Sequence, residues 1–157
     1  MIIKLEHNVV INRPIEEVFA YVTDIENAPK WKSRLLEVRR ISKGPVGAGT
    51  REIHVGKFLG WIFETIVEIT DYEPNRKVGF KTTSGPLSAK GEFTFESVEG
   101  GTRVTLVAGR EPSGFLKLIG PIVAHIAQRQ LETDLAKLKE LLETSYNRNG
   151  DKRRMKK

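Results

Sequence analysis

The stretch PIVAHIAQRQLETDLAKLKELLETS, residues 121–145, has the clearest helical pattern in this chain of 157 residues. Leucines recur in it at steps of four, three and four residues, which places them on one face of an α-helix. They are Leu131, Leu135, Leu138 and Leu142. Pro121 suits a first helical turn, because its missing N–H has no partner there. A helix of about 37 Å with a leucine face must pack against something, and the rest of the chain is mainly strand. We therefore expect a sheet curled around this helix.

Alternation of apolar and polar residues predicts seven strands in the rest of the chain. Their expected ranges are 3–12, 35–42, 50–57, 61–72, 78–84, 87–98 and 102–111. Two short helices fit between the first two strands: one begins at Pro14, and the other begins near Asp24 and ends at Pro29. Short turns between the later strands, such as the Gly100-Gly101 pair, predict antiparallel pairing. The expected class is α+β, with a curved antiparallel sheet of about seven strands wrapped around a long C-terminal helix.

The net charge of +6 is concentrated at the C-terminus. Residues 146–157 contain six basic residues against the single acidic Asp151, so this segment carries +5 and residues 1–145 carry +1. A domain that binds nucleic acid usually presents a basic face, so we expect no nucleic-acid binding by the folded part. We expect one folded domain, residues 1–145, and a disordered basic tail, residues 146–157, capable of weak contacts with anionic partners.

The chain lacks the residues that several kinds of catalytic and metal sites require. There is no cysteine, which excludes disulfides and a thiol nucleophile. The three histidines, His7, His54 and His125, do not have metal-ligand spacing, so we expect neither a metal nor a cofactor. Phosphate-binding loops, HExxH and GxSxG are also absent. The first six residues lack the apolar run of a signal peptide, so we expect a cytoplasmic protein.

Five motifs resemble those of one protein family. They are VVINRPIEEVFAYVTDIENAPKW (9–31), GPVGAGT (44–50), EPNRKVGF (73–80), GEFTFESVEGGTRVTL (91–106) and LETDLAKLKELLE (131–143). Together they are similar to the START-like superfamily, also called SRPBCC, and above all to its polyketide cyclase/dehydrase-like members. The resemblance covers residues 1–145 and implies the helix-grip fold. Its motifs are turns, caps and core positions, so it implies a fold more than an activity.

A ligand cavity is expected between the sheet and the start of the long helix. Residues 115–127 are apolar around nearly the whole helix, which indicates burial on more than one side. Deep packing explains this pattern, and so does a cavity along one side. The candidate ligand-binding residues are Trp61, Phe63, Phe80, Phe93, Phe95, Arg110, Ile119, Val123, Ala124, Ala127, His7 and His125.

The polar candidates each have an alternative interpretation. His7 and Arg110 alternate in step with apolar strand residues and so point inward, where a buried arginine needs an acceptor. An ordinary core histidine and an arginine that ends a strand in solvent give the same pattern. His125 lies on the apolar part of the helix, near the expected cavity mouth. His54 lies between Ile53 and Val55, and we expect it to face water.

Three functions are compatible with these features. The first is binding or transport of a hydrophobic small molecule, such as a lipid, a polyketide-like compound or an aromatic, and the lack of a reactive constellation favours it. The second is a cyclase or dehydratase in which an inward histidine or arginine moves protons or stabilises an enolate. The third is an interaction module, such as the quinone-chaperone or ribosome-associated members of the same superfamily. The sequence assigns no catalytic residue and no oligomeric state.

Overall fold

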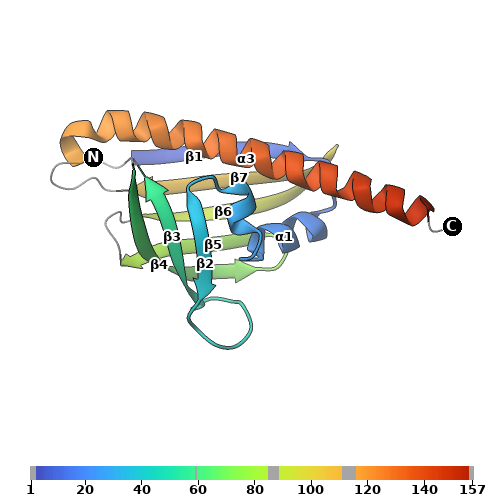
Figure 1. Ribbon diagram of the computed structural model, residues 1–157, viewed down its shortest axis with the longest axis horizontal. Coiled ribbons are helices and arrows are strands. Elements are labelled where there is room, and N and C mark those ends of the chain that lie inside the picture. The colour runs from blue at the N-terminus through green and yellow to red at the C-terminus, as the bar shows by residue number, and fades with distance from the viewer. Residues whose placement is uncertain (1–2, 59, 85–88, 111–115, 156–157) are drawn as a thin grey trace.

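The computed structural model (Figure 1) describes residues 3–58, 60–84, 89–110 and 116–155, without the side chains of residues 3, 58, 110, 116–120 and 145–155. Its elements follow the expected order of one strand, two short helices, six strands and a long helix. They are β1 (Ile3–Ile11), α1 (Ile15–Thr23), α2 (Ala28–Trp31), β2 (Leu35–Arg40), β3 (Arg51–Phe58), β4 (Trp61–Glu73), β5 (Lys77–Ser84), β6 (Lys90–Val98), β7 (Gly101–Arg110) and α3 (Leu116–Met155). The expected start of a strand at Leu87 lies outside the described residues.

The seven strands form one antiparallel sheet in the order β1-β7-β6-β5-β4-β3-β2. The chain therefore builds the sheet from β2 to β7 by successive neighbours, and β1 closes the far edge beside β7. The sheet curls, with α3 lying along the β1 side and α1 crossing its open side (Figure 1). The predicted α+β fold class, a curved antiparallel sheet around a long C-terminal helix, is confirmed.

The leucine face of α3 is buried, as its spacing predicts. Leu135 and Leu138 have no exposed surface, and they belong to a core that also contains residues of α1 and of strands β4 to β7. Polar contacts also attach α3 to β1. The ammonium of Lys139 donates to the carbonyl oxygen of Val10 at 2.6 Å, and the backbone N–H of Asn12 donates to Glu143 Oε1 at 3.1 Å. These contacts hold the helix along β1.

Helix α3 is longer than the expected range at both ends. It begins at Leu116, so Pro121 lies inside the helix instead of in its first turn, and it continues to Met155. The backbone hydrogen bonds of a helix need no apolar partner, so α3 can continue beyond Leu142, where the leucine pattern stops. The side chains of residues 145–155 lie outside the described part, so the separate basic tail stays a prediction.

The expected burial of the first part of α3 on more than one side is wrong in its described residues. Val123 is buried, but Ile122 on another face of the helix is 63% exposed. The first turns of α3 extend past the ends of the strands (Figure 1), so no sheet lies on their outer side. The apolar pattern here reflects one covered face and one open face.

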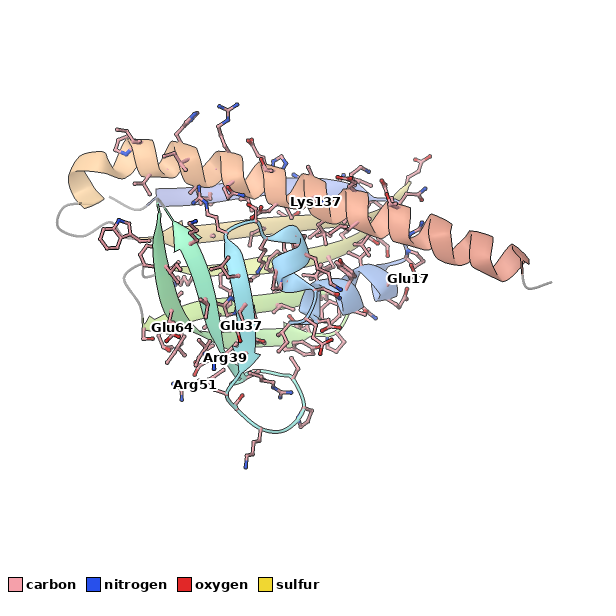
Figure 2. All side chains as sticks on the ribbon, viewed as in Figure 1. Glu17, Glu37, Arg39, Arg51, Glu64 and Lys137 are labelled. Atoms are coloured by element: carbon pink, nitrogen blue, oxygen red, sulfur yellow. The ribbon has the colours of Figure 1, made fainter. Side chains whose placement is uncertain are left out.

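The outer face of the sheet at β2, β3 and β4 is charged. Arg39 Nε lies 3.1 Å from Glu37 Oε1, and Arg39 Nη2 lies 3.8 Å from Glu64 Oε1. Figure 2 shows these three labelled side chains on the outer side of the sheet, near Arg51. All three are more than half exposed, so such pairs contribute little stability. They mark which face of these strands meets water.

Candidate ligand-binding site

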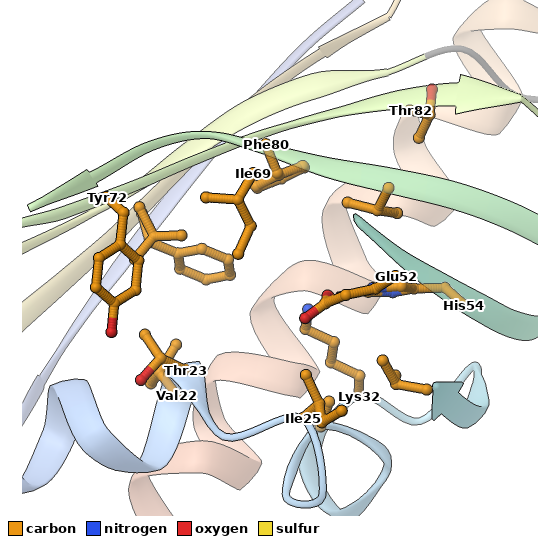
Figure 3. Close-up of a pocket in the computed structure, with 15 residues that line it drawn as sticks. Val22, Thr23, Ile25, Lys32, Glu52, His54, Ile69, Tyr72, Phe80 and Thr82 are labelled. Atoms are coloured by element: carbon orange, nitrogen blue, oxygen red, sulfur yellow. The ribbon is translucent and has the colours of Figure 1, made fainter. Parts of the chain in front are cut away.

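A cavity of about 160 Å³ lies between the inner face of the sheet and the segment that contains α1 and α2 (Figure 3). Most of its wall is apolar. The strands contribute Val38, Val67, Ile69, Val78, Phe80 and Phe93, and the helical segment contributes Val22, Ile25 and Ala28. A largely apolar space with a few polar groups is the usual form of a small-molecule site.

The alternation of β4 and β5 explains how the wall forms. In the antiparallel register Val67 pairs with Thr82 and Ile69 pairs with Phe80, so these side chains share one face of the sheet. Tyr72 follows beyond an irregularity in the register and brings its ring to the end of the cavity near α1. The sequence pattern of β4 therefore directs the apolar residues Val67 and Ile69 inward, as expected.

One end of the cavity is polar, and three side chains form it. Glu52 and His54 come from the inner face of β3, and their Oε1 and Nε2 atoms lie 3.0 Å apart. Lys32 enters from the opposite side, directly after α2, and its amine points toward these two residues (Figure 3). The side chains of Glu52 and His54 are only 10% and 19% exposed. A carboxylate so deeply placed is stable only with partners that compensate its charge.

The position of Lys32 is set by contacts on both sides of it in the chain. Its backbone N–H donates to the carbonyl oxygen of Ala28 at 3.0 Å, which ends α2. The next residue, Ser33, donates from its N–H and its hydroxyl to Asp134 Oδ1 on α3, at 3.2 and 3.1 Å. The ammonium itself lies 5.0 Å from the ring centre of Trp31 and 5.5 Å from that of Phe93. These two rings provide cation–π contacts at the cavity wall.

Burial changes the acid–base properties of two of these groups. It lowers the pKa of the Lys32 ammonium, while the charges of Glu52 and Asp134 oppose this shift. It also lowers the pKa of the His54 imidazole, against the opposing effect of the hydrogen bond with Glu52. Both shifts favour the neutral forms. The polar end thus combines a carboxylate with an imidazole and an amine whose neutral forms burial favours.

The expectation that His54 faces water is wrong. Ile53 and Val55 flank His54 in the strand, and apolar strand residues usually point toward the inner face of a sheet. In the sheet, β3 lies near the edge, and its apolar residues are on the outer face while Glu52 and His54 point inward. Two polar residues at i and i+2 in a strand share one face. That spacing was the available signal for an inward polar cluster.

The aromatic candidates occupy three different environments. Phe80 and Phe93 line the cavity. Phe95 lies deeper, with its ring centre 5.0 Å from that of Phe19 in the core under α1. Phe63 is half-buried, and Trp61 is 71% exposed. Trp61 is the first residue of β4 and pairs with Phe58, the last residue of β3.

A second, smaller cavity of about 100 Å³ lies where the first part of α3 crosses β1 and β7. Its lining residues are Leu5, Ala89, Ala108, Gly109, Val123, Ala124 and Ala127. Three of the five helical candidates, Val123, Ala124 and Ala127, therefore lie together around this smaller space and not around the larger cavity. Small side chains on the helix and on β7 leave the space open.

His7 and His125 line neither cavity. His7 is half-buried on β1, where it pairs with Leu106 of β7. His125 is exposed on α3. Arg110 ends β7 and Ile119 belongs to α3, but their side chains lie outside the described residues. Sequence reasoning missed the polar residues Lys32, Glu52 and His54, and it also missed apolar lining residues of α1, β2, β4 and β5.

Among the described residues, no three histidine or acidic side chains gather where they could hold a metal ion. In the same part of the chain, no helix combines the length and the apolar character needed to cross a membrane.

Comparison with known proteins gives a family match and several similar folds. A family model described as polyketide cyclase / dehydrase and lipid transport matches residues 3–143. A search of curated proteins found no match. The structure of TTHA0849 from Thermus thermophilus is 21% identical, with a TM-score of 0.79 over 90% of this chain and 98% of that one. The Zhui aromatase/cyclase from a Streptomyces species is 15% identical, with a TM-score of 0.77 over 91% and 94% of the two chains. Ara h 8.0201 is 13% identical, with a TM-score of 0.66 over 92% and 99%. At these identities the solved structures support the fold alone.

Proposed function

The chain belongs to the polyketide cyclase/dehydrase and lipid transport family, and we propose that within it this protein binds a small hydrophobic molecule in the 160 Å³ cavity. The observation that carries the proposal is the cavity wall itself. Val67, Ile69, Phe80 and Phe93 present apolar surface to a partly enclosed space between the sheet and the segment that contains α1 and α2. Transfer of an apolar molecule into such a space removes its surface from water, which provides the driving force for binding.

The size of the cavity limits the ligand. An apolar cavity of about 150 Å³ accommodates a benzene molecule, so a space of about 160 Å³ fits a single ring and not a long acyl chain. We therefore expect the apo form to bind small aromatics directly. Larger members of the expected ligand class, such as lipids, would require the second cavity or an opening of the helical segment.

A pair of matched variants tests the binding proposal. Val38→Phe places a ring at a lining position of β2, whereas Val55→Phe places the same ring on the outer face of β3. Toluene binding is measured by calorimetry, with circular dichroism to check folding. We expect Val38→Phe to weaken binding at least tenfold and Val55→Phe to match the wild type. Absence of toluene binding to the wild type, or equal binding by both variants, would contradict the proposal.

Catalysis is the second candidate function, and the Glu52–His54 contact favours it. An imidazole held 3.0 Å from a carboxylate is suited to take a proton, and the Lys32 ammonium is suited to stabilise a developing enolate oxygen. The test is hydrogen–deuterium exchange at the methyl group of acetophenone in D₂O, followed by NMR. Catalysis predicts accelerated exchange that His54→Gln removes. Exchange no faster than with an equal concentration of free imidazole would eliminate this candidate.

A further inference from the structure

The polar end of the larger cavity contains more hydrogen-bonding capacity than the protein uses. Glu52 Oε1 is engaged by His54, and a carboxylate has a second oxygen that can accept. In the described part of the chain, no side-chain hydrogen bond or ion pair reaches Lys32 Nζ, which contacts the Trp31 and Phe93 rings. An ammonium has three N–H donors. The cavity thus offers donors from Lys32 and an acceptor from Glu52 at the same place.

This combination discriminates between ligand head groups. A ligand carboxylate would accept from Lys32, but it would also bring a second negative charge beside Glu52 in a poorly solvated space, which is costly. A protonated ligand amine would place a second positive charge beside the Lys32 ammonium, which is costly for the same reason. A neutral hydroxyl avoids both repulsions, because it accepts a hydrogen bond from Lys32 and donates one to Glu52. The charges of the site therefore favour a hydroxyl group.

The rest of the wall determines what carries that hydroxyl. Phe80 and Phe93 provide aromatic surface, Val67 and Ile69 provide aliphatic surface, and the volume is that of one ring. We infer that the cavity selects a single-ring phenol, bound with its ring between these side chains and its hydroxyl at Lys32, Glu52 and His54. This inference rests on the proposed function, because it specifies the ligand class of the same cavity.

Three probes of similar size separate the contributions of ring and head group. Phenol has the hydroxyl, toluene has a methyl group in its place, and benzoate has a carboxylate; each is titrated by calorimetry at pH 7.5. We expect phenol to bind at least tenfold more tightly than toluene, and benzoate to bind more weakly than phenol. In Lys32→Met the preference for phenol over toluene should fall below twofold, while toluene affinity stays within threefold of the wild type. Lys30→Met, which changes an exposed lysine two residues away, is the matched control and should keep the preference.

Glu52→Gln provides an independent test, because it keeps the size and most of the hydrogen bonding but removes the charge. Benzoate should then bind at least tenfold more tightly than it does to the wild type. Equal affinity for phenol and toluene, tightest binding of benzoate by the wild type, or an unchanged benzoate affinity in Glu52→Gln would overturn the phenol inference. Toluene binding would still support the proposed function in those cases. If none of the three probes binds, both the inference and the proposed function fall.

Discussion

Glu52 Oε1 lies 3.0 Å from His54 Nε2 on the inner face of β3, and both side chains are shielded from solvent. Burial lowers the pKa of His54 in the folded protein below its ordinary value of 6.5. As the pH falls below about 6.5, the imidazole therefore takes up a proton in the unfolded chain before it does so in the folded one. The free energy of unfolding then decreases with falling pH, since the unfolded state binds more protons.

This gives a prediction for His54→Gln. Between pH 7.5 and pH 5.0, the wild type should lose more stability than the variant, by about 1.4 kcal/mol for each full unit by which the folded pKa is lowered. Urea unfolding followed by circular dichroism at several pH values measures the difference. His125→Gln removes an exposed histidine and should follow the wild-type profile. Parallel profiles for His54→Gln and the wild type would show that burial does not affect this imidazole.

Leu135 and Leu138 should dominate the stability of the helix–sheet packing. Both are fully buried, so Leu135→Ala or Leu138→Ala should lower the free energy of unfolding by about 2–5 kcal/mol. Lys137, between them in the chain, is exposed on α3 (Figure 2). Its replacement by alanine should change stability by less than about 0.5 kcal/mol. Denaturant unfolding of the three variants is the measurement, and small losses at both leucines would contradict the packing.

The fold was predictable from the sequence because its signals are periodic and local. The leucines from Leu131 to Leu142 place α3 on the sheet by their spacing alone, and strand alternation gives the order of β1 to β7. At most strand ends, the expected boundary differs from the observed one by only one or two residues. The length of α3 was harder to predict, because residues such as Asn149 and Gly150 are poor helix formers. Its helical extent past Ser145 has no apolar signature.

The site was less predictable, because its key residues follow no period. Lys32 reaches the cavity since Ser33 is attached to Asp134, a contact between residues 101 positions apart. His54 points inward on β3, whereas Ile53 and Val55 lie on the outer face of this strand near the sheet edge. Alternation made Trp61 a candidate for the cavity wall, yet it lies exposed at the start of β4. Periodicity identifies the two faces of a strand, but tertiary pairing decides which face is enclosed.

Residues 146–157 should be dispensable for stability. The contacts that attach the end of α3 to β1 involve Glu143 and Lys139, which a chain truncated after Ser145 retains. We expect removal of residues 146–157 to change the melting temperature by no more than about 4 °C, the shift that 1 kcal/mol produces in a domain of this size. Scanning calorimetry of both chains at the same salt concentration is the test. A larger decrease would show that these residues dock on the domain.

Phe80 on β5 lies one strand, β6, away from the β7 residues beside the smaller cavity. On the inner face of the sheet, Gly91 pairs with Phe80 on one side and with Ala108 on the other. Phe80 lines the larger cavity and Ala108 lines the smaller one. A Cβ atom on Gly91 would lie 2.7 Å from Phe80 Cζ, so the ring lies over this glycine. The absence of a side chain at Gly91 is what allows this ring position.

Phe80→Ala should join the cavities and admit a two-ring ligand. The wild type has room for a single ring, so 2-naphthol should bind poorly to it and at least tenfold more tightly to the variant, as measured by fluorescence titration. Loss of the ring will cost about 3–5 kcal/mol of stability, so Phe80→Leu serves as a milder second variant with an intermediate effect. Adding Ala124→Trp to Phe80→Ala fills the smaller cavity and should abolish the gain, whereas Ala124→Trp alone should leave phenol affinity unchanged. If Phe80→Ala and Phe80→Leu fold but bind 2-naphthol no better than the wild type, the ring does not partition the space. If Ala124→Trp alone weakens phenol binding, the ligand already extends to α3 in the wild type.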